Sequence, residues 1–235
     1  YEQRMYPNNF IPKDAYEKAF NQKELLRKQY GFSMMSPFDT WTSVGPSPGF
    51  YFGYSNITSR MATVKYDPNN PNIIYIGAAC GGIWKSTNGG TTWTAKSDYE
   101  VSLSSGSIAI DPSNTNIIYY GTGEASYSGV SYYGRGLLKS TDAGNNWISL
   151  NTDLPSASYT SRIAIRPNNS AQLLAAMSYE GLFRSTNSGI NWFRILSGRC
   201  DDVIFSPTGD TVYVIGNGTG YKISVNGGVS FTDNS

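Results

Sequence analysis

The sequence predicts an all-β fold built from short antiparallel strands, and three observations lead to this prediction. One turn motif, Ser-x-Asp/Asn-x-Gly-x-x-Trp/Phe, occurs four times at similar spacing. An apolar, strand-like segment that ends at a proline precedes each copy. The composition, with 18 tyrosines, 25 glycines and only 15% charged residues, is typical of aromatic strands joined by polar turns. Four strands in each repeat of about 40–50 residues is the pattern of a β-propeller blade.

The residues that the four copies of the turn motif share can be explained by the local structure of a hairpin turn. The Asp or Asn side chain can accept hydrogen bonds from backbone N–H groups of its own turn, and the glycine supplies a positive φ. The serine caps the turn, and the aromatic residue begins the outgoing strand and packs over the hairpin. We therefore interpret these residues as turn formers. They are Ser86, Asn88, Gly90, Trp93; Ser140, Asp142, Gly144, Trp147; Ser185, Asn187, Gly189, Trp192; and Ser224, Asn226, Gly228, Phe231.

Each repeat is predicted to contain four strands in chain order. The first strands end at the four prolines, and the second strands cover about residues 73–77, 117–121, 173–177 and 211–215. The third strands cover 82–85, 136–139, 181–184 and 220–223, and the turn motif joins each to a fourth strand. The second repeat differs from the others because residues 124–134 form an insertion between its second and third strands.

The chain divides into an N-terminal helical segment with a linker, residues 1–40, and four blades, residues 41–235. The blades are expected at about 41–97, 98–154, 155–198 and 199–235. A helix is predicted over residues 15–30, followed by Gly31, and it could pack on the outer wall of the propeller or dock a partner. Because four blades would close only as a minimal ring, we expect a larger propeller that continues beyond Ser235.

Charge and composition exclude several function classes. The formal net charge is +1 and no basic stripe is present, so binding to nucleic acid is not expected. No apolar stretch approaches the roughly 20 residues of a membrane span. The sequence contains no histidine, which excludes within it a Ser-His-Asp triad, a Cys-His dyad and a histidine metal site.

The start of the chain and its composition predict a secreted or cell-surface protein. The chain begins with Tyr1 rather than Met and shows no signal-peptide core, which favours a mature chain over a trimmed one. Its two cysteines, Cys80 and Cys200, fall in strand-like segments of different repeats. We expect two buried thiols rather than a disulfide bond.

The turn motifs, together with the segments Gly81-Gly-Ile-Trp-Lys-Ser86 and Gly121-Thr-Gly-Glu124, resemble the Asp-box (BNR-repeat) propellers over residues 41–235. That superfamily includes sialidases, sortilin-type Vps10 receptors and xyloglucan-cleaving glycosidases. The Trp41–Pro46 entry is most similar to large secreted bacterial propeller proteins that use type 9 secretion. The resemblance implies a protein or polysaccharide partner, including an outer-membrane secretion or motility assembly.

The resemblance does not extend to the catalytic residues of the enzymes in this superfamily. In the xyloglucan-cleaving members, a catalytic Asp in the first blade precedes a Gly-Gly pair by two residues. Ala79 occupies that position here, and its methyl group cannot serve as acid or base in a two-carboxylate mechanism. The arginine triad of sialidases has no motif match in the sequence. We therefore expect no catalytic residue among the 235 residues.

The candidate binding residues lie in the insertion of the second repeat. Glu124 follows a strand and stands beside Tyr127, Tyr132 and Tyr133, a combination that could bind sugar hydroxyls or a cation. The alternative is that Glu124 caps the loop by accepting backbone N–H groups. The segment Asp67-Pro-Asn-Asn70 offers oxygen ligands of the kind that Ca²⁺ takes, but it lacks calcium-loop spacing, so no metal site is predicted.

Two functional hypotheses follow, from different classes. The first is a non-catalytic propeller that binds a protein or glycan and could be cargo or an accessory subunit of a bacterial surface secretion or motility assembly. The second is a glycoside hydrolase that acts on polysaccharide. A hydrolase requires two carboxyl groups roughly 5–10 Å apart in one cleft, whereas a binding module does not.

Overall fold

The computed structural model describes residues 15–30, 60–126 and 131–233 of the chain. The chain forms two compact units, residues 1–60 and 61–235. Within the first unit the described part is helix α2 (Ala15–Tyr30), at the residues where the sequence predicts a helix. The predicted start of the first blade, residues 41–59, lies outside the described residues.

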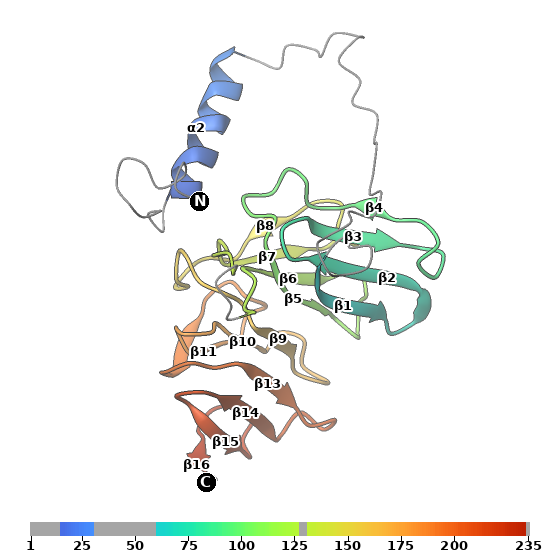
Figure 1. The fold of residues 1–235 in the computed structure, drawn as a ribbon. Helices are drawn as coiled ribbons and strands as arrows, with labels where there is room; N and C mark the ends of the chain where they lie inside the picture. Colours follow the sequence, from blue (N-terminus) through green and yellow to red (C-terminus); the bar gives the residue numbers. More distant parts are fainter. Residues whose placement is uncertain (1–14, 31–59, 127–130, 234–235) are drawn as a thin grey trace, which may run out of the picture. The chain divides into compact units, whose positions relative to one another are not determined.

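The second unit contains four antiparallel sheets of four strands each, with the strands of each sheet in chain order (Figure 1). Blade 1 consists of β1 (Met61–Asp67), β2 (Asn70–Ala78), β3 (Gly82–Ser86) and β4 (Thr94–Ala95). Blade 2 consists of β5 (Ser105–Ile110), β6 (Ile118–Thr122), β7 (Leu137–Ser140) and β8 (Ile148–Ser149). Blade 3 consists of β9 (Arg162–Ile165), β10 (Leu173–Ala176), β11 (Leu182–Ser185) and β12 (Phe193–Leu196). Blade 4 consists of β13 (Asp202–Phe205), β14 (Val212–Gly216), β15 (Gly220–Ser224) and β16 (Thr232–Asp233).

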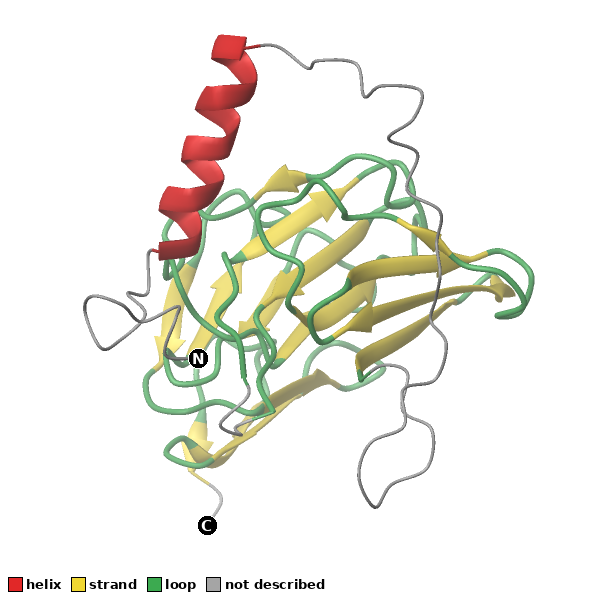
Figure 2. Cartoon of the chain, turned by 45° about the horizontal axis from the view of Figure 1, so that its top comes forward, coloured by secondary structure: helices red, strands yellow, loops and turns green. Residues whose placement is uncertain are grey.

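The four sheets follow one another in space as they do in the sequence. The first strand of each blade contacts the first strand of the next, from β1 to β5, β9 and β13. Figure 2 shows that the described part of this unit is made of strands and connecting loops alone. The predicted all-β architecture of four-stranded blades, with a short N-terminal helix, is confirmed.

Antiparallel order places the connections at two opposite ends of the blades. At one end, which we call the loop face, lie the loops between second and third strands and the links between blades. At the other end, which we call the turn face, lie the proline turns and the four repeated turns. The insertion of blade 2 is therefore on the loop face.

The hydrophobic core lies between successive blades rather than at a single centre. One cluster of buried side chains joins blade 1 to blade 2 and includes Tyr75 and Ile108. A second joins blade 2 to blade 3 around Trp192, and a third joins blade 3 to blade 4 around Leu174. Because both sides of an inner blade are covered, its second strand is buried at every residue, as in β6 and β10. In β14, at the end of the array, buried and exposed residues alternate.

The repeated turns share one hydrogen-bond pattern, which centres on the serine hydroxyl. In blade 3 the Ser185 hydroxyl donates to Asn187 Oδ1 (3.0 Å) and accepts the N–H of Gly189 (2.9 Å). The same two bonds recur at Ser86, Ser140 and Ser224. In every copy, the glycine that lies two residues after the Asp or Asn has a positive φ. These residues therefore shape the hairpin itself.

The turns also fasten neighbouring blades to each other. The Trp147 indole N–H donates to the Lys96 carbonyl of the preceding blade (2.7 Å). In return, the Tyr75 hydroxyl of blade 1 donates to the Ala143 carbonyl in the turn of blade 2 (3.1 Å). Tyr119 reaches the Ser188 carbonyl of blade 3 in the same way (3.5 Å). These two joints thus each pair the face of one blade with the turn of the next.

Asp142, the one acidic member of the four turns, should make stability depend on pH. Hydrogen bonds from the Asn146 side chain and backbone, and from Ser140, lower the pKa of Asp142 to about 2 from 3.8. Because the folded-state pKa is depressed, this contribution is present above about pH 4 and is lost as the pH falls toward 2. Asn serves at this position in the other turns, so Asp142→Asn should fold and should lose less stability over that interval. Thermal melts of both proteins at pH 5 and pH 2.5 measure the difference, and equal losses would contradict the expectation.

The expectation of two buried thiols is wrong for one cysteine. Neither cysteine forms a disulfide bond, and Cys200 is buried, but Cys80 is exposed. Cys80 lies in the short connection between β2 and β3 rather than inside a strand, so the chain turns its side chain outward. Burial, followed by the charges of Asp201 and Asp202, raises the pKa of Cys200 to about 12, which keeps it a thiol.

Candidate binding surface on the loop face

Three tyrosines from successive segments form a continuous row of rings on the loop face. Tyr133 stacks on Tyr159 with ring centroids 4.6 Å apart and an interplanar angle of 18°. Tyr159 in turn meets Tyr179 edge to face, with centroids 6.4 Å apart. The guanidinium of Arg199 lies over the Tyr179 ring, 5.5 Å from its centroid. We call Tyr133, Tyr159 and Tyr179 the tyrosine row; it runs from the insertion of blade 2 to the β10–β11 loop of blade 3.

The tyrosine row combines exposed ring surface with phenol hydroxyl groups. Tyr133 is 41% exposed and Tyr179 is 57% exposed, while the central Tyr159 is partly buried. Burial, and then the neighbouring Tyr133, raises the pKa of the Tyr159 hydroxyl well above its ordinary value. The row therefore presents flat apolar faces together with hydrogen-bond donors, as amphipathic aromatic side chains do at binding surfaces.

Backbone hydrogen bonds hold the ends of the blade 2 insertion in place. The Gly134 N–H donates to the Ser158 carbonyl (2.8 Å), which ties the insertion to the link that carries Tyr159. The Glu124 N–H donates to the Tyr132 carbonyl (3.0 Å) and lies 3.1 Å from the Ser104 hydroxyl. Tyr133 is thus positioned by its two neighbours in the chain and by the next blade.

Glycines let these segments approach each other more closely than other residues could. A Cβ atom at Gly106 would lie 2.1 Å from the Thr160 carbonyl oxygen and 2.3 Å from that of Gly123. A Cβ atom at Gly134 would lie 2.2 Å from the Thr122 carbonyl carbon. Because the obstructing atoms belong to the backbone, side-chain movement could not relieve these contacts. The packing beneath the tyrosine row therefore depends on these glycines.

The predicted binding residues differ in their exposure to solvent. Tyr133 lies in the tyrosine row, and its neighbour Tyr132 is 39% exposed beside it in the chain. Glu124 is only 4% exposed, so its carboxylate lies beneath the surface, where its charge acts on Tyr159. Arg135 is likewise buried and donates from Nη1 to the Ser156 carbonyl (3.1 Å). Tyr127 lies outside the described residues.

Sequence reasoning did not identify Tyr159, Tyr179 or Arg199 as site residues. Tyr159 lies in the link between blades 2 and 3, and Arg199 lies in the link before blade 4. Tyr179 lies in the loop between second and third strands of blade 3, the same position in the repeat as the blade 2 insertion. Alignment of the repeats could therefore have pointed to Tyr179.

Two of the acidic residues near this end of the blades are engaged in ion pairs. Asp201 accepts from Arg199 Nε (2.7 Å), and Asp202 accepts from Arg162 Nε (2.7 Å). Ala79, at the position that resembles a catalytic Asp, is 4% exposed in the β2–β3 connection of blade 1. The two aspartates therefore form ion pairs within the fold, and the buried Ala79 side chain has no titratable group.

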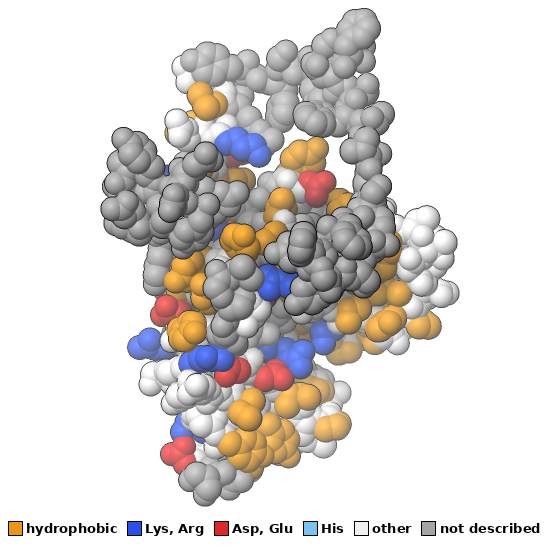
Figure 3. All heavy atoms as spheres, viewed as in Figure 1, with side chains coloured by type: hydrophobic (Ala, Val, Ile, Leu, Met, Phe, Trp, Pro, Cys, Tyr) orange, Lys and Arg blue, Asp and Glu red, His pale blue; other side chains and the backbone are white. Residues whose placement is uncertain are grey.

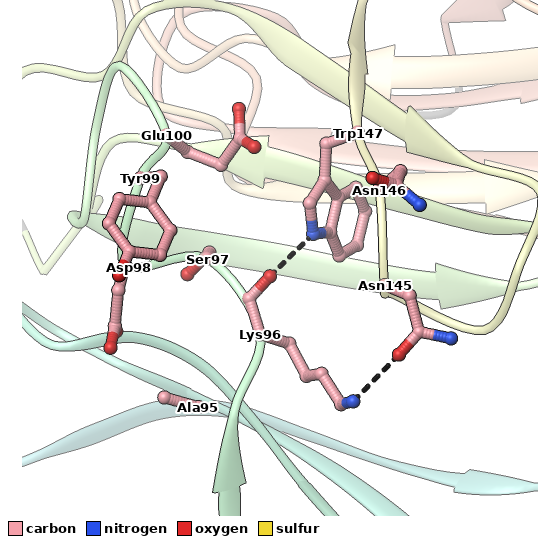
Figure 4. A pocket seen from close by; sticks show the side chains of 9 residues that line it. All are labelled: Ala95, Lys96, Ser97, Asp98, Tyr99, Glu100, Asn145, Asn146 and Trp147. Atoms are coloured by element: carbon pink, nitrogen blue, oxygen red, sulfur yellow. Dashed lines mark hydrogen bonds between the residues drawn. The ribbon is translucent and has the colours of Figure 1, made fainter. Parts of the chain in front are cut away.

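A hollow of about 360 Å³ lies between the end of blade 1 and the turn of blade 2 (Figure 4). Lys96 donates to Asn145 Oδ1 (2.8 Å), and its carbonyl accepts the indole N–H of Trp147. Glu100 faces the hollow, and burial raises the pKa of its carboxyl. The hydrogen bonds drawn in Figure 4 connect the two blades, so these polar groups contribute to the joint.

A second hollow, also about 360 Å³, is lined by residues of the first strands of all four blades. Its wall is mainly apolar, with Lys65 and Arg162 as the cations. Burial, and then the charge of Arg162, lowers the pKa of Lys65, and Asp202 opposes this effect. The charges are therefore grouped where the first strands of blades 1, 3 and 4 converge.

The described residues show neither a metal cluster nor a membrane helix. Within them, no three His, Cys, Asp or Glu side chains gather in a way that could hold a metal ion. Asp67, in the segment considered for Ca²⁺, accepts the Asn69 N–H in its own turn (2.8 Å). Helix α2, the described α-helix, lacks the length and apolar character needed to span a membrane.

Comparison with known proteins shows likeness in structure. No family model and no curated protein matches the sequence. An ancestral GH74 enzyme superposes with a TM-score of 0.62 at 23% identity, over 74% of this chain and 25% of that enzyme. The GH74 enzyme of Niastella koreensis gives 0.60 at 20% identity, over 82% and 33% of the two chains. YCF48 from Cyanidioschyzon merolae gives 0.51 at 18% identity, over 74% and 55%.

These similarities concern the fold alone, because all three identities are below 25%. The aligned region spans a quarter to a third of the length of the two GH74 enzymes and about half of YCF48. The described sheets and these neighbours agree on the architecture. The chain is a partial β-propeller of four blades with a short N-terminal helix.

Proposed function

We propose that this chain is a non-catalytic binding module of a secreted or cell-surface protein, and that it holds a polysaccharide across the tyrosine row. The observation that carries the proposal is the row itself, three rings in contact with an arginine at one end. The four turns and the Tyr- and Gly-rich, weakly charged composition support membership of the Asp-box superfamily and an extracellular location.

A polysaccharide fits the chemistry of this surface better than a charged ligand does. The faces of a sugar ring carry C–H groups and its rim carries hydroxyls, so tyrosine can stack on the first and hydrogen-bond to the second. Arg199 is already paired with Asp201, and Glu124 lies beneath the surface. The exposed part of the row is thus aromatic and hydroxylic, which suits a neutral glycan.

Two observations favour binding over hydrolysis. Ala79 stands where the enzymes that the sequence resembles carry a catalytic Asp. Asp201 and Asp202 each form an ion pair with an arginine, Arg199 and Arg162, so both carboxylates already have a partner within the fold. The GH74 enzymes share the fold with this chain, and their activity is not carried over.

The test is affinity electrophoresis of the folded chain against neutral plant and bacterial polysaccharides, xyloglucan among them. We expect retardation by at least one, and roughly fivefold weaker binding for Tyr133→Ala and for Tyr179→Ala. That factor corresponds to about 1 kcal/mol for one aromatic contact. Phe193→Ala is the matched control, because Phe193 is 65% exposed and follows the repeated turn at the opposite end of blade 3.

Three outcomes would overturn the proposal. Release of reducing sugar from a bound polysaccharide would establish a hydrolase. Equal loss of binding in Phe193→Ala would place the glycan elsewhere. Failure to bind any glycan, with capture of a protein through the tyrosine row, would identify a protein-binding surface instead.

A further inference from the structure

The hollow drawn in Figure 4 lies at a joint inside the described array, and its two walls come from blades that contact each other. One wall consists of residues 95–100, from the end of β4 into the link to β5. The other consists of residues 145–147, where the turn of blade 2 leads into β8. The volume of about 360 Å³ lies within the roughly 300–1,000 Å³ of small-ligand sites. We call this space the Glu100 hollow.

The nitrogen donors that line the Glu100 hollow are already engaged within the protein. The Trp147 indole N–H donates to the Lys96 carbonyl (2.7 Å), and the Lys96 ammonium group donates to Asn145 Oδ1 (2.8 Å). The side-chain amides of Asn145 and Asn146 each donate to Asp142 in their own turn, both at 2.7 Å. These bonds fasten the turn and the joint. A ligand therefore meets nitrogen donors that the fold has already used.

The two acidic side chains of the Glu100 hollow have no comparable partner. Among the residues that the structure describes, neither Glu100 nor Asp98 forms a hydrogen bond or an ion pair through its carboxylate. Lys96, the cation of the wall, directs its ammonium group to Asn145 instead. Burial alone raises the pKa of the Glu100 carboxyl, and no neighbouring positive charge offsets this effect. The hollow thus presents unused hydrogen-bond acceptors.

Two aromatic rings flank the Glu100 carboxylate. In Figure 4 the carboxylate lies between the rings of Tyr99 and Trp147. The Tyr99 side chain is 77% exposed, and Trp147 is partly exposed. Tyr120 meets the Trp147 ring edge to face, with centroids 5.8 Å apart, so the joint holds this ring in place. One ring is therefore fixed, and the other offers most of its surface to a ligand.

We propose that the Glu100 hollow binds an arginine side chain of a partner protein. A guanidinium group has five N–H donors and no acceptor, so it complements a wall whose acceptors are unused and whose nitrogen donors are engaged. Its plane can stack on an aromatic ring while its edge forms two hydrogen bonds to one carboxylate. Two carboxylates and one ammonium group line the hollow, so its formal charge is negative and favours a cation.

Lysine and neutral sugars match these groups less well. A lysine ammonium group is compact and strongly hydrated, and it cannot lie flat on a ring as a guanidinium does. A sugar hydroxyl accepts hydrogen bonds as well as donating them, and the wall has its nitrogen donors engaged.

The expected contact is with one basic side chain rather than with a wide basic surface. Figure 3 shows Lys and Arg side chains interspersed with Asp and Glu side chains on the face in view, and among the described side chains of that face neither charge forms a large area. Recognition should therefore depend on the Glu100 hollow itself. It is independent of the polysaccharide proposed for the tyrosine row, which involves other residues.

The test is an NMR titration of the isotope-labelled chain with a blocked pentapeptide that carries one arginine among glycines and serines. The indole N–H signal of Trp147, identified by its loss in Trp147→Phe, should shift and saturate. The same peptide with citrulline, which keeps the shape of arginine without its charge, should leave the signal in place. The peptide with lysine should bind roughly threefold more weakly than the arginine peptide.

Two substitutions in the wall should weaken binding of the arginine peptide. Glu100→Gln removes the charge and should weaken it roughly tenfold, or about 1.4 kcal/mol. Tyr99→Ala should weaken it roughly threefold, whereas Tyr99→Phe keeps the ring and should bind like wild type. Glu180→Gln is the matched control, because Glu180 is also partly exposed but lies in the β10–β11 loop of blade 3. It should bind the peptide like wild type.

Stability measurements separate a binding role of Glu100 from a structural one. Because its carboxylate has no partner among the described residues, Glu100→Gln should unfold in urea at no lower a midpoint than wild type. A clearly lower midpoint would show that the carboxylate supports the fold, and would overturn the proposal. If this variant does not fold, Asp98→Asn and Tyr99→Ala, both at exposed residues, provide the binding test.

Four further results would overturn the proposal. They are the absence of a saturable shift with the arginine peptide, an equal shift with the citrulline peptide, unchanged binding in Glu100→Gln, and equal weakening in Glu180→Gln. A shift of the Trp147 signal by cellobiose, without one by the arginine peptide, would assign the hollow to a glycan instead. Failure of polysaccharide binding at the tyrosine row would leave all of these results unchanged.

Discussion

Replacing Trp192 by alanine is expected to lower the free energy of unfolding by about 3–5 kcal/mol, the range for a large aromatic residue removed from a core. The Trp192 side chain is 1% exposed and belongs to the cluster that joins blades 2 and 3. Its indole N–H also donates to the Gly189 carbonyl (3.0 Å) of its own turn. The substitution leaves a cavity at the centre of the array. Urea denaturation followed by tyrosine and tryptophan fluorescence measures the change.

Trp93→Ala is the matched control, because Trp93 holds the same position in the turn of blade 1. No blade described in the structure precedes blade 1, and Trp93 remains partly exposed. Its loss should therefore cost clearly less than the loss of Trp192. Equal destabilisation by both variants would show that the aromatic residue acts within its own hairpin and not across the joint.

Replacing Gly106 by alanine is expected to be the second most damaging change, at or above the upper end of the roughly 1–3 kcal/mol typical of overpacking. The added methyl carbon would lie 2.1 Å from the Thr160 carbonyl oxygen and 2.3 Å from that of Gly123. Both atoms belong to the backbone, so the blades themselves would have to separate. Because Thr160 follows Tyr159, the shift should also weaken glycan binding at the tyrosine row.

Gly81→Ala provides the comparison for this variant. Gly81 lies in the β2–β3 connection, and the nearest atom to its added methyl carbon would be the Ala78 side chain at 3.1 Å. A small local adjustment should accommodate that contact, so the midpoint of urea unfolding should change little. A Gly106→Ala protein as stable as Gly81→Ala would mean that the joint between blades 2 and 3 is looser than the structure shows.

The strands and turns could be predicted because their determinants are local. The Ser185 hydroxyl finds its partners in Asn187 and Gly189, within five consecutive residues, so the motif alone defines the hairpin. Helix α2 likewise ends directly before Gly31, as its sequence predicts. The burial of Cys80 was predicted wrongly because strand bounds alone do not show which side chains of a short connection face solvent.

The tyrosine row could be predicted only in part, because its members meet through the packing of blades. Tyr133 lies in a visible insertion, but Tyr159 and Tyr179 lie in segments of ordinary length. Their rings come together only once Gly106, Gly123 and Gly134 allow the links to approach. The exposure of a side chain could not be predicted from the repeat either. Tyr75 and Tyr213 are both tyrosines at the same position of the second strand, yet Tyr75 is buried and Tyr213 is exposed.

Each described sheet is complete in itself, and no strand passes from one sheet to another. Side chains, turns and the links between blades therefore connect the sheets. A duplication of one blade within the gene would deliver both the face and the turn that the copy needs to join its neighbours. Only positions such as Gly77 and Gly121, where the next blade presses on the strand, would then require further change. The lineage of such a protein can lengthen or shorten by whole blades, while the residues that bind a ligand on one blade evolve separately from those on the next.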